Sequence, residues 1–156
     1  RGEEHPIKSH STFTNCGRSV PEAQKLGCTY DILSNHWVPD KCMDEQAVKW
    51  YQADGSWQGF ADENRTEVVD VAAMGTTGLY YTSMRDHIVH CAILWKKQFA
   101  AFYRERGYYD SLIVDPEHTD HCVDFLIDMT DHGVDFRKIP IKVEVGFAGC
   151  WVQNRY

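Results

Sequence analysis

The pattern His-x-x-His-Cys occurs twice in this chain, as His87-Ile88-Val89-His90-Cys91 and as His118-Thr119-Asp120-His121-Cys122. Residues three and four apart share one face of an α-helix, so each copy would project two imidazoles and a sulfur from one side. A single His-x-x-His pair is more often solvated or hydrogen-bonded than metal-bound. Its repetition, with Cys at the same offset, favours a metal site between two facing helices.

Both copies lie in segments that carry the signals of helix ends. Ser83-Met84-Arg85-Asp86 resembles an N-terminal cap with an acidic residue three positions on, and Gly107 is expected to end this first helix. Its apolar residues recur at helical spacing: Ile88, Cys91, Ala92, Leu94, Trp95, Phe99 and Phe102. The second helix is expected to begin with Asp115-Pro116-Glu117, a cap, a first-position proline and a first-turn acid. Residues 108–114 are long enough for a reversal, so we expect the two helices to run antiparallel.

The doubled motif resembles that of the UstYa-like proteins, which occur in fungal secondary-metabolite clusters and are linked to copper-dependent oxidation. The resemblance covers about residues 16–128. It includes these further landmarks: Cys16-Gly17, Glu22-Ala23, Gly27-Cys28, Trp37-Val38-Pro39-Asp40-Lys41-Cys42, Tyr80 and Glu117-His118-Thr119. The segment Ser83–Asp86 departs from the family, in which aromatic and acidic residues are common before the first motif.

This resemblance implies a copper-dependent oxidoreductase that uses oxygen on C–H bonds of a small-molecule or peptide metabolite, as in mycotoxin biosynthesis. The outcome in the family is oxidative cyclisation, dehydrogenation, hydroxylation or chlorination. The expected metal ligands and catalytic residues are the four motif histidines: His87, His90, His118 and His121. Tyr80 and Tyr81, directly before the first motif helix, are expected to pack there or contact substrate. A second copy or a paired family member is an expected partner.

Two other interpretations of the histidines stay open. A coupled dicopper site with three imidazoles per copper needs two more histidines, and His36 and His132 are the only other donors outside the N-terminal tail. The spacing of His36 and His132 does not indicate that they are ligands. We therefore expect four imidazoles that hold one copper or two under-coordinated coppers. Alternatively, four histidines would complete a closed zinc or copper site that stabilises a binding or partner module without catalysis.

Six cysteines, an even number, suit three disulfides in an oxidising compartment. If the motifs face one another, Cys91 and Cys122 are neighbours, and we favour a disulfide between them over thiolate ligands. Cys16 and Cys28 bracket a short helical stretch, which leaves Cys42 with Cys150. The alternative pairings Cys16–Cys42 with Cys28–Cys150, and Cys28–Cys42 with Cys16–Cys150, are not excluded by the sequence.

Composition is that of a folded domain, with 156 residues, 43% hydrophobic and 13% aromatic. A net charge of −7 without a basic run argues against nucleic acid as a partner. The UstYa-like resemblance implies an N-terminal transmembrane helix before a lumenal domain. Because the chain begins with Arg1, we expect it to be the lumenal part of a membrane-anchored protein of the secretory pathway. Asn64-Arg65-Thr66 is a glycosylation acceptor that agrees with this compartment.

The remaining pattern predicts a mainly α fold with a small β element (α+β), held by disulfides. Residues 1–14 are polar and expected to form a flexible arm, and residues 15–156 a single domain. Further helices are expected at Pro21–Leu26, Asp40–Tyr51 and Thr66–Met74, with a short strand near Phe60 and a C-terminal strand over Ile139–Phe147. Signatures of zinc proteases, serine hydrolases, phosphate loops and dinucleotide sites are missing, so the chemistry is expected to come from the metal.

Overall fold

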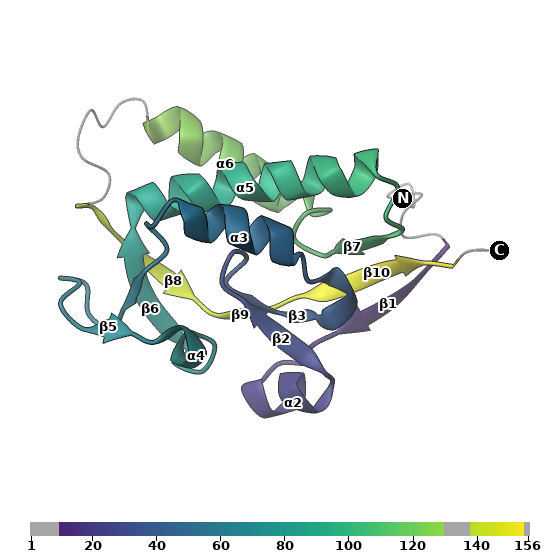
Figure 1. Cartoon of the computed structure of the whole chain (residues 1–156), viewed down its shortest axis with the longest axis horizontal. Helices are drawn as coiled ribbons and strands as arrows, with labels where there is room; N and C mark the ends of the chain where they lie inside the picture. Colours follow the sequence, from purple (N-terminus) through teal and green to yellow (C-terminus); the bar gives the residue numbers. More distant parts are fainter. Residues whose placement is uncertain (1–9, 130–137, 155–156) are drawn as a thin grey trace.

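A computed structural model describes residues 10–129 and 138–154, in which a layer of helices lies above short strands (Figure 1). The helical layer consists of α3 (Glu45–Ala53), α5 (Met84–Tyr103) and α6 (Pro116–Asp128). Two shorter helices, α2 (Val20–Lys25) and α4 (Val71–Met74), lie at the other side of the strands. None of the helices in the described residues is long and apolar enough to cross a bilayer.

The strands form three small sheets, so the fold is mixed α/β and our prediction of a mainly α fold is wrong. The sheet orders are β1-β10-β7, β2-β3-β9 and β5-β4-β6-β8. The strand bounds are β1 (Ser11–Asn15), β2 (Cys28–Asp31), β3 (His36–Pro39), β4 (Gly59–Phe60), β5 (Val68–Val69), β6 (Leu79–Ser83), β7 (Tyr108–Asp110), β8 (Pro140–Glu144), β9 (Gly146–Phe147) and β10 (Gly149–Gln153). Strands of two to five residues are too short for an alternating apolar pattern to stand out in the sequence.

The two motif helices begin where the capping signals predicted. Ser83 accepts a hydrogen bond from the backbone N–H of Asp86 at 3.0 Å, and Asp115 accepts one from that of Glu117 at 3.0 Å. Each cap satisfies a donor that a helix leaves open at its first turn. The first helix ends at Tyr103, earlier than the predicted stop at Gly107.

Two other expected helices are shorter than predicted. The segment Asp40–Tyr51 divides into a 3₁₀ turn, η1 (Asp40–Cys42), and α3, because Asp44 caps a new start by accepting from Ala47 N–H at 3.1 Å. In the segment Thr66–Met74, Val68 and Val69 form β5 and only the last four residues are helical. Adjacent β-branched residues favour a strand. This preference explains why Val68 and Val69 are not helical although the apolar residues of the segment have helical spacing. The expected short helix α2 and the short strand β4 are confirmed.

Both ends of the described chain meet in one sheet. Strand β1 pairs antiparallel with β10, from Ser11 opposite Gln153 to Asn15 opposite Gly149. Residues 11–14, expected at the end of a flexible arm, are therefore part of a sheet. The expected C-terminal strand Ile139–Phe147 is present as two pieces, β8 and β9, that pair with different sheets.

Two disulfides join the four cysteines outside the motifs in the pairing that we favoured. Cys16 bonds Cys28, beside α2, and Cys42 bonds Cys150, which ties η1 to β10 across a sequence separation of 108. A crosslink that closes so long a loop removes about 4 kcal/mol or more of conformational freedom from the unfolded chain in the simple entropic model.

A buried cation holds the loops beneath α5. The Nζ atom of Lys97 lies 2.6 Å from Asp110 Oδ2 and 3.7 Å from Asp31 Oδ2, and all three side chains are shut off from solvent. Burial alone would lower the pKa of Lys97, but the Asp110 and Asp31 carboxylates outweigh it and raise this pKa. The lysine therefore stays charged and links α5 to the ends of β2 and β7.

Candidate metal centre

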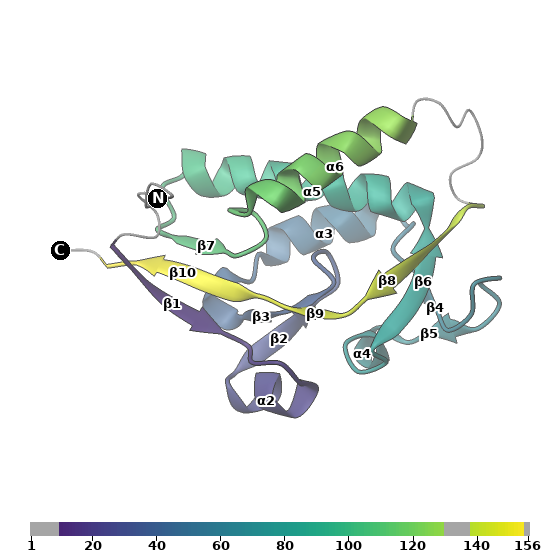
Figure 2. The same cartoon turned by 180° about the vertical axis from the view of Figure 1, so that it is seen from behind.

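The motif helices pack so that the two histidine pairs meet across their interface. The rings of His87 and His121 have centroids 5.6 Å apart, and those of His90 and His118 are 5.8 Å apart. The earlier histidine of one helix thus meets the later histidine of the other, as expected for antiparallel helices. Figure 2 shows α6 and α5 side by side, with β8 below α6.

All four motif histidines line one cavity of about 260 Å³. Its other walls are the turn before β3 with the first residue of that strand, the end of β6, the start of α5 and strand β8. These walls contribute Ser34, Asn35, His36, Thr82, Asp86, Ile141, Lys142, Val143 and Glu144. A closed apolar cavity of roughly 150 Å³ already accepts benzene, so the volume here suffices for one ring or side chain of a larger substrate.

His90 is held in a defined orientation. It is buried, and its Nδ1 lies 2.5 Å from the backbone carbonyl oxygen of Leu33. Because a carbonyl only accepts, Nδ1 carries the proton and Nε2 keeps its lone pair. The Leu33 turn is itself fixed by Asp31 Oδ1, which accepts from Leu33 N–H at 2.9 Å. A hydrogen bond from the second ring nitrogen is the usual support of a metal-binding histidine.

His87 is packed differently, with its ring centroid 4.0 Å from that of Phe125. Among the described residues, its buried Nδ1 has no hydrogen-bonding partner. A buried nitrogen without a partner is costly, and a metal ion would satisfy it. His118 is half-buried, whereas His121 is exposed at the interface.

Burial keeps these imidazoles neutral. It lowers the pKa of His90 from 6.5 to about 3, with a further contribution from His87. Burial and the neighbouring His121 lower the pKa of His87 to about 4. Burial, then His36, lowers the pKa of His118 as well. Only the neutral form of imidazole binds a metal, so the site is ready for a cation near neutral pH.

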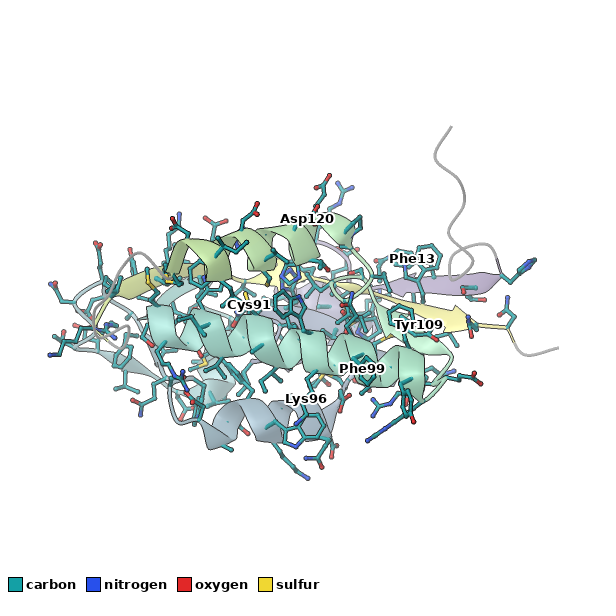
Figure 3. The ribbon with its side chains drawn as sticks, turned by 90° about the horizontal axis from the view of Figure 1, so that it is seen from above. Phe13, Cys91, Lys96, Phe99, Tyr109 and Asp120 are labelled. Atoms are coloured by element: carbon teal, nitrogen blue, oxygen red, sulfur yellow. A yellow bond between two sulfur atoms is a disulfide. The ribbon has the colours of Figure 1, made fainter. Side chains whose placement is uncertain are left out.

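The two motif cysteines are free thiols, which corrects the expected Cys91–Cys122 disulfide. The helices do bring the sulfurs together, but Cys91 donates a hydrogen bond to Cys122 instead of bonding to it covalently. This contact raises the pKa of Cys91 and lowers that of Cys122. In Figure 3, Cys91 lies on the side of α5 that faces α6, whereas Asp120 points outward. The donor atoms of His90, His118 and Cys122 all lie within 4.8 Å of one another, so one sulfur is within reach of the imidazoles.

Two cavity residues carried no clear signal in the sequence. His36 lies at the start of β3, and the turn before it brings it beside the motif helices. Asp86 precedes the first motif and accepts a hydrogen bond from Tyr51 at 2.5 Å. Asp86 precedes His90 by four residues, so both lie on the same helix face. The sequence contains this signal, but we interpreted Asp86 only as part of the helix cap. His132 lies outside the described residues.

Tyr80 and Tyr81 do not line the cavity. The Tyr80 hydroxyl lies 3.0 Å from that of Tyr30 and 2.5 Å from Asn35 Oδ1, so it reaches the cavity only through Asn35. Substrate contact by either tyrosine stays a prediction. Asn64 is exposed between β4 and β5, where glycosylation also stays a prediction.

Comparisons with known proteins give two relatives. No family model and no solved structure matches the chain. Over 133 residues it is 28% identical to Phomopsin biosynthesis cluster protein B of Diaporthe leptostromiformis, and equally to protein B' of that fungus. The match covers 78% of this chain but 39% of each relative. The chain is therefore similar to fungal biosynthesis cluster proteins and spans less than half their length.

The lowered histidine pKa values predict how the metal-free protein responds to acid. Unfolded histidines take up protons below about pH 6.5, whereas His87 and His90 stay neutral in the folded state down to about 4 and 3. The unfolded state then binds more protons, so these groups lower the free energy of unfolding as the pH falls below about 6.5. Burial raises the pKa of Asp86 to about 6, which acts in the opposite direction.

We therefore expect Asp86→Asn to steepen the loss of stability on acidification. Urea unfolding of the metal-free protein at several pH values between about 7 and 5 measures this slope for wild type and variant. A slope that is unchanged or shallower in Asp86→Asn would contradict the assignment.

Proposed function

We propose that this chain is a UstYa-like, copper-dependent oxidoreductase domain of fungal secondary metabolism, which uses oxygen on C–H bonds of a small-molecule or peptide metabolite. The observation that carries the proposal is one cavity lined by His87, His90, His118 and His121. The similarity to two biosynthesis cluster proteins supports the metabolic context. The two disulfides support a place in an oxidising compartment, such as the secretory lumen.

The donor set fits copper. Neutral imidazoles suit copper, and copper has the highest affinity of the divalent first-row metals for such ligands. The buried Nδ1 of His87 supplies one donor that lacks a protein partner within the described residues. Copper would bring reversible one-electron chemistry and reactivity toward oxygen, which no side chain here supplies.

The chain's own residues would bind and orient the substrate. Strand β8 lines the cavity with Ile141, Lys142, Val143 and Glu144, of which Lys142 and Glu144 have exposed side chains that form an ion pair at 3.0 Å. Asp86, which is 3% exposed and hydrogen-bonded to Tyr51, lies against the same space. With its pKa raised to about 6, mainly by burial, this carboxyl group can hold or release a proton near neutral pH.

A metal-stabilised binding or partner module is the second candidate, and one contact favours it. Cys122 lies within 4.8 Å of His90 and His118, and cysteine sulfur and histidine nitrogen are the usual zinc ligands. In such a site Cys122, which does not line the cavity, would take one position on the ion. The open space beside all four histidines favours the catalytic function instead, because chemistry on a substrate requires access.

Turnover on a metabolite panel distinguishes these functions. We expect the copper-loaded domain, with oxygen and a reductant, to oxidise a cognate metabolite and to lose activity with a copper chelator or with azide. One panel run with and without chloride assigns the outcome: chlorinated product indicates a halogenase, and loss of two hydrogens or gain of one oxygen indicates an oxidase. Turnover that survives complete copper removal would contradict the proposal.

A further inference from the structure

A fifth imidazole faces the cavity from outside the doubled motif. His36 is the first residue of β3 and lines the same cavity as the four motif histidines. It is half-buried, and it belongs to the sheet layer and not to either motif helix. It therefore adds a donor from the side of the cavity that the helices do not provide.

The turn before β3 orients His36 in the same way as His90. The Nδ1 atom of His36 lies 2.6 Å from the carbonyl oxygen of Ser34, and the Nδ1 atom of His90 lies 2.5 Å from that of Leu33. The carbonyl groups of the consecutive residues Leu33 and Ser34 thus each accept a hydrogen bond from one imidazole. In both rings the proton is fixed on Nδ1, and Nε2 keeps a lone pair for another partner. This is the support that metal-binding histidines usually have.

Strand β9 confines the His36 ring from the other side. Gly146 lies opposite His36 in the parallel pairing of β3 and β9, and its N–H donates to the Asn35 carbonyl at 3.0 Å. A Cβ atom built at Gly146 would lie 2.1 Å from Nε2 of His36. Any side chain at this position would displace the ring, so the backbone here is suited to keep the imidazole in the cavity.

His36 lies beside His90, because their Nδ1 atoms donate to the consecutive carbonyls of Ser34 and Leu33, and the ring of His118 lies 5.8 Å from that of His90. His87 and His121 form the other pair, in ring contact with each other. The ring of His87 also lies 5.8 Å from that of His90, so the imidazoles form one connected cluster with His36 beside His90.

We propose that His36 is a third imidazole ligand, which with His90 and His118 holds the more tightly bound copper ion. The inference rests on the proposed copper site and adds a ligand that the doubled motif does not contain. The group of donors within 4.8 Å of one another consists of His90, His118 and Cys122, so a shared ion requires the His36 ring to move toward the two histidines. The remaining pair, His87 and His121, is left as a two-imidazole position.

Copper affinity tests this assignment independently of turnover. Competition of the purified domain against a chromophoric chelator gives the dissociation constant for the first equivalent of copper(II). We expect His36→Ala to weaken it by about tenfold or more and to reduce the nitrogen coupling in the copper electron paramagnetic resonance spectrum. His10→Ala is the matched control, because His10 does not line the cavity and should bind as wild type.

One further variant and a chemical rescue separate ligand loss from misfolding. Gly146→Ala removes no donor but displaces the His36 ring, so we expect weaker copper binding with an unchanged far-ultraviolet circular dichroism spectrum. Added imidazole should restore affinity in His36→Ala. Wild-type affinity and an unchanged spectrum in His36→Ala would overturn the inference and leave the proposed function intact. Failure of the wild-type domain to bind copper would overturn both.

Discussion

Replacing Lys97 with methionine is expected to lower the free energy of unfolding by about 3–5 kcal/mol. Lys97 is 3% exposed, and its ammonium group is the partner of two carboxylates, Asp110 and Asp31, that are 1% exposed each. Removing the cation leaves two like charges buried in one place. Such uncompensated charges cost far more than the loss of a surface ion pair.

Urea unfolding at neutral pH measures this loss, and the adjacent Lys96 provides the control. Lys96 is exposed and its Nζ lies 3.5 Å from the centroid of the Trp50 ring, so Lys96→Met should cost about 1 kcal/mol or less. Adding Asp31→Asn and Asp110→Asn to Lys97→Met should recover part of the stability. A Lys97→Met protein within 1 kcal/mol of wild type would show that the buried charges are not coupled as described.

Replacing His90 or His118 with alanine is expected to remove copper binding and to reduce oxidation by about 100-fold or more. Both residues belong to the proposed three-imidazole group, and His90 is the most buried of the motif histidines. Loss of either changes the geometry and the potential of the ion together. His87→Ala should weaken the binding of the first copper ion less than His90→Ala or His118→Ala does. His87 belongs to the two-imidazole position, which is not the more tightly bound one.

His10→Ala again serves as the control, with copper content and turnover expected at wild-type levels. Circular dichroism of each metal-free variant shows whether it folds. Folded His90→Ala and His118→Ala proteins that keep wild-type turnover would contradict the assignment of the motif as the active centre.

The helices of the site could be predicted from sequence because their signals are local. Ser83 and Asp115 each accept from a backbone N–H two or three residues on, and such contacts depend only on neighbouring residues. The repeat of His-x-x-His-Cys then fixed which faces meet. The ring pairs His87–His121 and His90–His118 follow from antiparallel packing of these faces.

The sheets and the far side of the cavity could not be predicted, because they depend on contacts between distant segments. Strand β1 pairs with β10 at the other end of the chain, and β3 pairs with β9 through only two residue pairs. His36 enters the cavity through that second pairing, so its position has no signature in local spacing. The prediction of a Cys91–Cys122 disulfide was wrong for another reason. Proximity of Cys91 and Cys122 was inferred correctly, but proximity permits a thiol hydrogen bond as well as a disulfide.

Copper bound per chain is the most direct test of the central claim, that the doubled motif forms a shared copper site. Elemental analysis after copper reconstitution and desalting should find copper in wild type and in His10→Ala. It should find much less in His90→Ala and in His118→Ala, which remove one ligand from each helix. Undiminished copper in both motif variants, or retention of zinc in preference to copper by the wild-type domain, would contradict the account.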